Sequence, residues 1–449
     1  MNLTKLLKIL SQRNCQKVYV KRLAANDNSK NQVYLGGSFD VLNILPIQNI
    51  ASDDEGDWKR TRFKSKLNFY WVTEDGEINI APDAQLILYP KYPEVRLSGF
   101  LKRARNAPSD LMAIRKEGRI LFLGVTLSGA ILAYVAEGDS EIGREFESLK
   151  NLPSVGVFQE LTVINGYIEE NPKQRLISEL RRIHFMGWID AKRLNSAKEI
   201  VPCSSSNCGG YTLEAELGIT PNGYAEPDYL GWEVKQFAVK NFSSLDSSVV
   251  TLMTPEPTGG FYVSEGIEAF IRKYGYKDKQ GREARLNFGG IYKRDVVNPN
   301  TGLTLVIEGF DAETTKIRDS SGYIALKDKE DNIAASWSFT SLIEHWKTKH
   351  TNACYVPSMH RKNDLYTFSK QQYCYGNKVK LGTITDFSLF LKQIHERVIY
   401  YDPGIKLEME LSGKRKQTIK RRSQFRIKSG NLSSLYKNNE IVDLRYEAD

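Results

Sequence analysis

Short apolar runs separated by turn-forming residues make up the part of the chain between residues 17 and 163. They are KVYVKRL, QVYLGG, LNFYWV, AQLILYP, RILFLGVTL and AILAYVA. Runs of this length, rich in β-branched and aromatic residues, are typical of strands. Ahead of them, Lys5 and Lys8 interrupt an apolar segment over residues 2–10, which favours an amphipathic helix. The pattern therefore predicts that the first part of the protein is mostly β.

The periodicity changes near Asn171 and Pro172. The segment NPKQRLISELRRIHFMGWI places apolar residues at helical spacing behind an N-cap at Asn171. Further helices are expected at 212–217, 339–347 and 386–397, and strands at 232–237, 302–309 and 406–411. A chain of 449 residues exceeds what one hydrophobic core usually organises, so we expect two domains, over residues 1–165 and 170–449.

The net charge of the chain indicates which class of partner it binds. A net charge of +9 suits a phosphate-rich partner such as nucleic acid, although the same surplus also serves solubility alone. No segment approaches the roughly 20 apolar residues that span a bilayer, so no membrane association is expected. Five cysteines at irregular spacing fit the reduced thiols of a cytoplasmic protein better than a disulfide framework.

Cys203 and Cys208 form the one close pair of cysteines in the sequence. Their spacing could hold two ligands of a zinc site, but no second pair of Cys or His follows at a usual distance. A plain loop with free thiols is the favoured interpretation.

The segment AEPDYLGWEVKQF concentrates candidate chemistry in Asp228, Glu233 and Lys235. In a strand, side chains two positions apart share a face, so Glu233 and Lys235 would point together into a cleft while Trp232 and Val234 point into the core. A turn after Asp228 can fold it back beside Glu233. Two neighbouring carboxylates repel each other unless a cation lies between them, and their hard oxygens favour Mg²⁺. The segment therefore predicts a magnesium site.

Hydrolysis of a phosphodiester needs an activated water and relief of the charge on the phosphate and the leaving oxygen. A metal held by carboxylates beside an ammonium group supplies both, with Lys235 orienting or activating the water. The same residue types also occur together by chance, and exposed hairpins are rich in them. The motif alone therefore leaves an ordinary surface hairpin as an alternative.

A further carboxylate lies upstream, on a short helix predicted from GGYTLEAELGI. Glu214 falls on the first turns of this helix, from which its carboxylate could reach the metal site directly or through water. Its alternative is a plain surface position. Glu216 points to another side of the same helix and is expected to face solvent.

These motifs resemble the restriction endonucleases of the MvaI and BcnI group, relatives of the repair nickase MutH. GWIDAKR, TLEAEL, PDYLGWEVK, ASWSF and QFRI occur in the order and approximate spacing of that family. The resemblance implies an α/β restriction-endonuclease-like domain of the PD-(D/E)xK, MutH-like type. It also implies that Asp228, Glu233 and Lys235 form the catalytic triad, with Glu214 as the helix glutamate. Enzymes of this group work as monomers with Mg²⁺ and nick one strand and then the other.

The segment KRKQTIKRRSQFRIK near the C-terminus has eight basic residues and no acidic one. It follows a predicted strand, which favours a loop that enters a DNA groove over a solvated basic tail. Arginine can read guanine through its planar fork. Candidates for base contacts are Arg421, Arg422 and Arg426, with Lys414 and Arg415 among the groups expected on DNA phosphates.

This segment departs from the family in one respect. The family's loop uses histidines for part of its recognition, and this segment has none. Only Arg426 matches cleanly, so this segment by itself does not establish the target sequence. His345 and His350 lie near a predicted helix end and are expected to be structural.

Near the N-terminus, VYVKRLAANDNSKNQVYL resembles the opening of the effector domain of EcoRII, a DNA-binding pseudobarrel. The mostly-strand pattern agrees with that fold. The resemblance implies two arms that grip DNA, a loop with Lys21, Arg22, Asn26, Asp27 and Asn28, and a basic segment with Arg96, Lys102, Arg103 and Arg105. The alternative for the first arm is a turn whose Asn and Asp side chains bond their own backbone.

The leading hypothesis is a site-specific, Mg²⁺-dependent type II restriction endonuclease of type IIE. Its N-terminal domain would bind one copy of a double-stranded DNA site and tether a monomeric catalytic domain that acts on another. CCWGG is the target that the resemblance suggests, and a companion DNA methyltransferase would fit. A repair-type nickase or a defence nuclease that reads modified DNA would use the same core. A DNA-binding regulator without catalysis is the alternative from another class, disfavoured because no expected catalytic position is lost.

Overall fold

The structure is a computed structural model of the chain. It describes residues 1–27, 32–37, 41–42, 44–53, 62–89, 94–150, 152–164, 166–168, 172–220, 229–346, 350, 352–364, 368–408 and 418–446. Five residues singled out above, Asn28, Asn171, Asp228, Lys414 and Arg415, lie outside these ranges.

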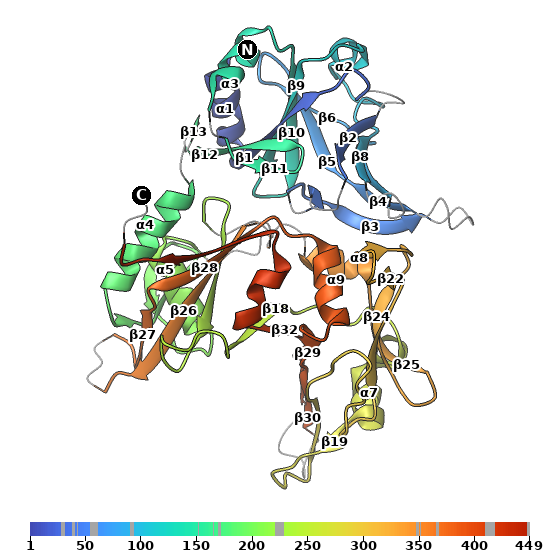
Figure 1. The fold of residues 1–449 in the computed structure, drawn as a ribbon, viewed down its shortest axis with the longest axis vertical. Helices are drawn as coiled ribbons and strands as arrows, with labels where there is room; N and C mark the ends of the chain where they lie inside the picture. Colours follow the sequence, from blue (N-terminus) through green and yellow to red (C-terminus); the bar gives the residue numbers. More distant parts are fainter. Residues whose placement is uncertain are drawn as a thin grey trace.

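The N-terminal part of the chain, residues 1–168, is built mainly of strands (Figure 1). Its strands are β1 (Cys15–Leu23), β2 (Gln32–Gly36), β3 (Gln48–Asp53), β4 (Arg62–Lys66), β5 (Asn68–Val72), β6 (Ile78–Ile80), β7 (Gln85–Tyr89), β8 (Glu94–Ser98), β9 (Arg119–Thr126), β10 (Ala130–Ala136), β11 (Ser154–Val155), β12 (Phe158–Ile164) and β13 (Tyr167–Ile168). Its helices are α1 (Leu3–Gln12), α2 (Ser109–Ala113) and α3 (Glu141–Ser148). Each apolar run that predicted a strand forms one, and the amphipathic segment at the start forms α1.

Two sheets and two of the helices surround the interior of this part. One sheet has the order β11-β12-β1-β9-β10-β5-β6, with β13 beside β12, and the other has the order β2-β8-β7-β4-β3. α1 and α3 cover the first sheet, with Leu6, Leu10 and Phe146 among their buried side chains. β9 and β10 are buried along their whole length, which explains why their sequences are continuously apolar and do not alternate. Closure of the sheets into a pseudobarrel stays a prediction.

The C-terminal part, residues 172–446, alternates helices with strands. Its helices are α4 (Pro172–Phe185), α5 (Cys208–Glu216), α6 (Phe261–Ser264), α7 (Gly266–Tyr274), α8 (Phe339–Trp346), α9 (Phe387–His395) and the 3₁₀ helix η5 (Ser429–Leu435). Its strands are β14 (Ile189–Asp190), β15 (Lys192–Leu194), β16 (Ile200–Pro202), β17 (Glu233–Ala238), β18 (Val249–Met253), β19 (Tyr276–Lys277), β20 (Arg285–Gly289), β21 (Thr304–Glu308), β22 (Phe310–Asp311), β23 (Lys316–Ile317), β24 (Tyr323–Lys327), β25 (Ile333–Ser338), β26 (Asn352–Lys362), β27 (Gln371–Tyr375), β28 (Lys378–Thr383), β29 (Tyr400–Tyr401), β30 (Gly404–Glu408), β31 (Thr418–Lys420), β32 (Phe425–Lys428) and β33 (Asn438–Asp443). The helices and strands expected from the sequence occur at their predicted places. His350 stacks on Trp346 with ring centroids 4.1 Å apart, in agreement with the structural role expected for it.

One sheet of the C-terminal part carries the candidate chemistry. Its order is β14-β27-β26-β28-β33, and β17 pairs with β26 in parallel. α4 and α5 pack on one face, where Leu180 and Leu213 share a core with Val234 of β17. Tyr355 of β26 belongs instead to the larger core of the molecule. Smaller sheets, β18-β32-β29, β19-β20-β30-β31 and β21-β24-β25, complete a mixed α/β fold.

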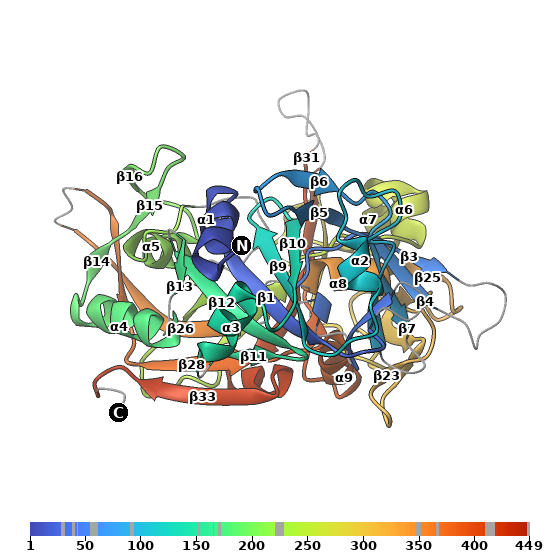
Figure 2. The same ribbon diagram turned by 90° about the horizontal axis from the view of Figure 1, so that it is seen from above.

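The two parts lie one above the other and touch (Figure 1). The backbone N–H of Ile50 in β3 donates to the Glu344 carboxylate of α8 at 3.2 Å. The buried cluster around this contact contains residues of both parts, Ile50 and Leu342 among them. Seen from above, α4 and β14 project beyond the N-terminal part on one side (Figure 2). The division of the chain into domains over residues 1–165 and 170–449 stays a prediction. Among the helices that the structure describes, none is long and apolar enough to cross a membrane.

Cys203 and Cys208 are joined by a disulfide. Cys203 follows β16 directly and Cys208 is the first residue of α5, so the loop between them returns one sulfur to the other. The prediction of a plain loop with free thiols is therefore wrong for this pair, and neither sulfur is available to zinc. Cys15, Cys354 and Cys374 are buried, and none of them forms a disulfide within the described part of the chain, as expected of reduced thiols.

Candidate active site

A tight turn precedes β17. Tyr229 and Trp232 exchange two backbone hydrogen bonds, of 2.9 and 2.8 Å, so the chain reverses over four residues. Leu230 and Gly231 between them have φ angles of 49° and 84°. A two-residue hairpin turn of this type needs positive φ at both central positions, which suits glycine. The turn expected after Asp228 is therefore present.

Glu233 and Lys235 lie on one face of β17. Glu233 is 5% exposed, and the Lys235 ammonium nitrogen Nζ donates to its Oε1 at 2.7 Å. Trp232 and Val234, each 6% exposed, pack into the core beside α4 and α5. The alternation predicted for this segment is confirmed, and it brings a buried carboxylate and an ammonium group into direct contact.

β26 presents a tyrosine to this pair. The parallel register sets Ala353 opposite Glu233 and Tyr355 opposite Lys235. Opposed side chains of neighbouring strands point to the same face, with strands about 5 Å apart. The hydroxyl groups of Tyr355 and Tyr436 bond each other at 2.8 Å. Sequence reasoning missed both tyrosines, because each lies more than a hundred residues from Lys235 and no spacing rule connects them.

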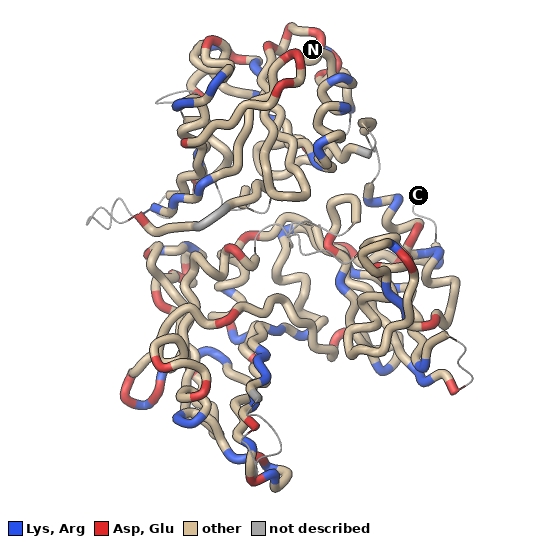
Figure 3. The backbone as a smooth tube through the Cα atoms, turned by 180° about the vertical axis from the view of Figure 1, so that it is seen from behind, with Lys and Arg blue, Asp and Glu red and all other residues tan. Residues whose placement is uncertain are grey.

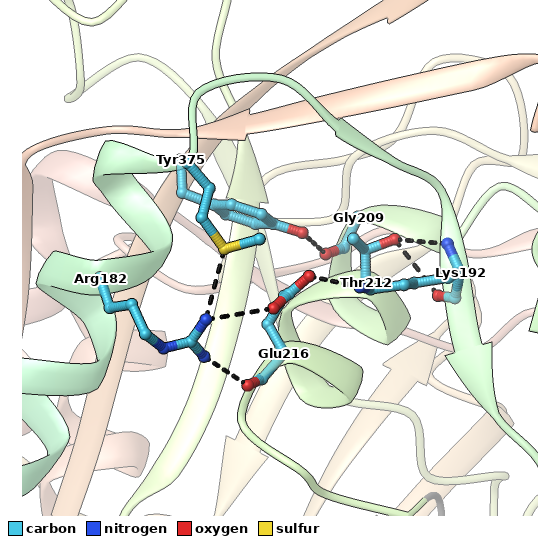
Figure 4. A network of polar contacts seen from close by, with 7 residues as sticks. Arg182, Lys192, Gly209, Thr212, Glu216 and Tyr375 are labelled. Atoms are coloured by element: carbon cyan, nitrogen blue, oxygen red, sulfur yellow. Dashed lines mark hydrogen bonds and ion pairs between the residues drawn. The ribbon is translucent and has the colours of Figure 1, made fainter. Parts of the chain in front are cut away.

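Glu214 lies half-buried on α5, which packs against β15 and β17. The Thr212 hydroxyl accepts from the backbone N–H of Lys192 at 3.0 Å and donates to its carbonyl at 3.2 Å. The Tyr375 hydroxyl donates to the carbonyl of Gly209 at 2.8 Å (Figure 4). These bonds fix the helix that carries Glu214 against the sheet.

Glu216, at the end of the same helix, does not face solvent as predicted. Its side chain is 7% exposed and its Oε1 lies 2.5 Å from the Lys192 ammonium. Arg182 of α4 donates to the Glu216 carbonyl at 2.8 Å, and its guanidinium lies 3.5 Å from Oε2 (Figure 4). The prediction failed because α4 and β15 converge on the last turn of α5, which the spacing within one helix cannot show. Glu216 therefore connects α5 with α4 and β15.

The carboxylates near β17 bear on metal binding. Within the residues that the structure describes, no three Cys, His, Asp or Glu side chains gather closely enough to hold a metal ion. Asp228, one of the two predicted metal ligands, lies outside them. A metal site at Glu233 would therefore depend on Asp228.

The three C-terminal arginines differ in exposure and in the bonds they make. Arg421 and Arg422 are exposed, and the Nε of Arg422 donates to Gln424 at 2.8 Å. Arg426 on β32 is held more firmly, because its Nη1 donates to Asp402 at 2.6 Å and its Nε to the Thr251 hydroxyl at 3.2 Å. Lysines and arginines follow the extended strand that runs down to the lower tip of the molecule (Figure 3). Lys414 and Arg415 are not described.

In the N-terminal part, Lys21 and Asp27 are buried, 6% and 5% exposed, and pair with each other at 2.6 Å. Asp27 also accepts from the backbone N–H groups of Ala24 at 2.8 Å and Tyr34 at 3.2 Å. Asp27 thus makes the backbone bonds that the alternative interpretation of this loop predicted. A cavity of about 360 Å³ opens beside the pair, lined by Lys21, Ala24, Asn26, Asp27, Gln32, Tyr34 and Arg96. The structure therefore brings the first arm and Arg96 of the second arm to one place.

Three of the four arginines of the two arms are paired with carboxylates. Arg22 donates from Nε to Glu147 at 2.7 Å, and Arg103 from Nη2 to Asp83 at 2.5 Å. Arg96 lies 3.0 Å from Glu94. The remaining members of the second arm are both exposed, Lys102 and Arg105. The contact of these side chains with DNA stays a prediction.

Lys17 connects the N-terminal part to the turn before β17. A Cβ placed on Gly231 would lie 2.0 Å from Lys17 Cε, so the lysine side chain packs directly on the turn. Its ammonium group bonds Glu160 and, at 2.8 Å, the Thr162 hydroxyl. This contact had no signal in the sequence, because it joins the two predicted domains.

Comparisons with known proteins show the family to which the chain is similar. A model of the MvaI/BcnI restriction endonuclease family matches residues 177–436. Among solved structures, restriction endonuclease MvaI in complex with its cognate DNA is 21% identical over 62% of this chain and 100% of its own, with a TM-score of 0.43. MvaI without DNA is 19% identical over 62% of this chain and 99% of its own, with a TM-score of 0.33. No curated protein sequence matches the chain significantly.

Proposed function

Since the chain belongs to the MvaI/BcnI restriction endonuclease family, we propose that it cuts double-stranded DNA at a specific sequence as a Mg²⁺-dependent type II restriction enzyme. The observation that carries the chemistry is the contact between Glu233 and Lys235, 2.7 Å on one face of β17, directly after a hairpin turn. A carboxylate beside an ammonium group at a strand end suits phosphodiester hydrolysis.

The turn supports Asp228 as the second metal ligand. In the sequence, Asp228 directly precedes the turn from Tyr229 to Trp232, and Glu233 directly follows it. Two carboxylates supply the hard oxygen donors that Mg²⁺ prefers, so the residues fit this ion. When bound, the metal lowers the pKa of a coordinated water and relieves charge on the phosphate.

The side chains of the protein have separate tasks in this proposal. Asp228 and Glu233 hold the metal, and Lys235 orients the attacking water and donates a hydrogen bond toward the phosphate. Glu214 joins them from α5, directly or through a water. Arg421 and Arg422 approach the bases and Lys414 and Arg415 the phosphates, whereas Arg426 must exchange its bond with Asp402 before it can contact a base.

The N-terminal part is proposed to bind a second copy of the DNA site and to act as an effector. Its cavity beside Lys21 and Asp27 and its exposed cations Lys102 and Arg105 offer surfaces for this contact. The protein would then be a cytoplasmic, monomeric type IIE enzyme. A CCWGG-like target and a companion DNA methyltransferase complete the proposal.

We expect the purified protein to cut a sequenced genomic DNA into fragments with one recurring end sequence when Mg²⁺ is present. Sequencing of the fragment ends identifies the site and the cut position. Excess EDTA should stop the reaction, because two carboxylates without a cation cannot activate water. Fragments with random ends would contradict site-specific cleavage.

Digestion of methylated and unmethylated plasmid separates the restriction enzyme from the alternative functions. A repair-type nickase would leave a plasmid as open circles, and a nuclease that reads modified DNA would cut only methylated substrate. A DNA-binding regulator would retard DNA in a gel and leave it intact with any divalent cation. Linear products from unmethylated plasmid favour the restriction enzyme.

A plasmid with two target sites should be cut at least about tenfold faster than one with a single site. Binding of one site by the N-terminal part raises the effective concentration of the other site at the catalytic part, to about the millimolar range for a short linker. Initial rates on supercoiled plasmids of equal length measure the difference. Adding a short duplex that carries the site should accelerate the one-site plasmid. Equal rates on both plasmids would contradict the tethering role.

A further inference from the structure

A pair of buried tyrosines lies beside the Glu233–Lys235 contact. Tyr355 is 1% exposed and Tyr436 is 5% exposed, and their hydroxyl oxygens are 2.8 Å apart. Tyr355 lies opposite Lys235 in the parallel register of β26 with β17, so both side chains point to the same face of the sheet. Glu233 shares that face, being two residues before Lys235. The tyrosine pair therefore adjoins both groups of the candidate active site.

The surroundings hold the two rings in place. The Tyr436 ring lies flat on the backbone of β28, since a Cβ on Gly382 would be 2.3 Å from its Cδ2. The rings of Tyr355 and Tyr436 meet at 64° with centroids 6.3 Å apart. A larger residue at position 382 would displace Tyr436 and break the bond between the hydroxyls. The fold thus fixes a polar pair in an apolar interior, where polar groups need partners.

The two hydroxyls have hydrogen-bonding capacity beyond the bond that joins them. The bond between the two hydroxyls uses one of their protons, and the hydroxyl oxygens keep lone pairs that can accept a hydrogen bond from an ammonium group. The pKa of Tyr355 is raised to about 12, mainly by burial; the positive charge of Lys235 acts to lower it and the negative charge of Glu233 to raise it. The pKa of Tyr436 is also raised, first by burial and in part by its interaction with Tyr355 and by the negative charge of Glu233. Both hydroxyls therefore stay protonated, and both interact electrostatically with the candidate active site, Tyr355 with Glu233 and Lys235 and Tyr436 with Glu233.

We propose that Tyr355 and Tyr436 are positioning residues for DNA cleavage, whose linked hydroxyls hold the Lys235 ammonium in its working place beside Glu233. Lysine has a long, flexible side chain that a fixed polar neighbour can restrain. The inference rests on the proposed function, because it assigns Lys235 its role in the reaction. It extends the active site to two residues that neither the motif nor the helix glutamate includes.

The test compares conservative variants of the full-length protein. Tyr355→Phe and Tyr436→Phe each keep the ring and remove one hydroxyl, so the fold should persist. Single-turnover cleavage at saturating protein measures the chemical step, and mobility shifts in EDTA measure DNA affinity. We expect each variant to cleave at least about tenfold more slowly, as outer-shell partners of an active site usually do when changed, with DNA affinity within about twofold. The double variant should be no slower than either single one, because all three lose the same bond.

Tyr274→Phe is the matched control. It removes a buried hydroxyl whose bond to Asp328 is 3.1 Å long, on α7 and away from β17. The control should cleave at the unmodified rate, and thermal unfolding of all variants should show similar midpoints.

Cleavage by Tyr355→Phe and Tyr436→Phe at the unmodified rate would overturn the inference alone. So would a loss of rate matched by an equal loss of DNA affinity, or an equal loss in Tyr274→Phe. An unmodified protein that leaves all DNA intact would instead overturn the proposed function, and the inference with it.

Discussion

Lys235→Ala should lower the rate of DNA cleavage by about 10³-fold or more and leave DNA affinity within about twofold. The ammonium group lies 2.7 Å from the Glu233 carboxylate, where it can orient a water and stabilise charge on the phosphate. No neighbouring lysine lies on the same face of β17 to replace it, since the next one, Lys240, follows the end of the strand. Single-turnover cleavage of a DNA fragment that carries the site measures the loss.

Glu233→Gln and Asp228→Ala should show the same separation of binding from cleavage, because each removes a proposed metal ligand. Lys240→Ala is the matched control, an exposed lysine just beyond β17. If Lys235→Ala and Asp228→Ala cut DNA at the unmodified rate, the whole assignment of the catalytic residues is wrong. Equal loss of rate and affinity would place these residues in DNA binding instead.

Gly231→Ala should lower the cleavage rate by about 10²-fold, the usual effect of a small displacement in an active site. Gly231 has φ of 84°, and a Cβ there would lie 2.0 Å from Lys17 Cε. The left-handed conformation costs an alanine about 1–2 kcal/mol, and the contact forces either the turn or Lys17 to move. Since the turn connects Asp228 with Glu233, its displacement separates the proposed metal ligands. Single-turnover cleavage and thermal unfolding report the two effects.

Gly302→Ala is the control that separates the effect of backbone strain from the effect of the contact with Lys17. Gly302 has φ of 69°, and a Cβ there meets nothing within 4 Å. It should therefore show a loss of stability of similar size with an unchanged cleavage rate. Adding Lys17→Ala to Gly231→Ala should recover part of the rate, because the smaller side chain makes room for the Cβ. A cleavage rate of Gly231→Ala equal to that of Gly302→Ala would show that the contact with Lys17 does not position the turn.

The sequence predicted those features that depend on neighbours along the chain. The strands of the N-terminal part follow from apolar runs, and the Glu233–Lys235 pair follows from the two-residue period of a strand. The turn before β17 lies at Gly231, between Asp228 and Glu233, where the sequence predicted it. These predictions needed no knowledge of what packs against each element.

Features that depend on distant segments could not be predicted. Glu216 is buried because Arg182 and Lys192 reach it from other elements. Tyr355 and Tyr436 meet only because β26 lies beside β17. Spacing in one segment carries no information about such partners. The Cys203–Cys208 disulfide shows the related limit that one spacing permits a loop, a metal site or a bond.

The parallel pairing of β17 with β26 sets the order in which a growing polypeptide can acquire activity. Glu233 and Lys235 leave the ribosome more than a hundred residues ahead of Ala353 and Tyr355, their partners on the neighbouring strand. Among the strands that the structure describes, β26 is the one that pairs with β17. A nascent chain that ends before β26 therefore carries the whole candidate triad without the sheet that arranges it. Cutting by the proposed active site would therefore have to wait until β26 has been made and has paired with β17.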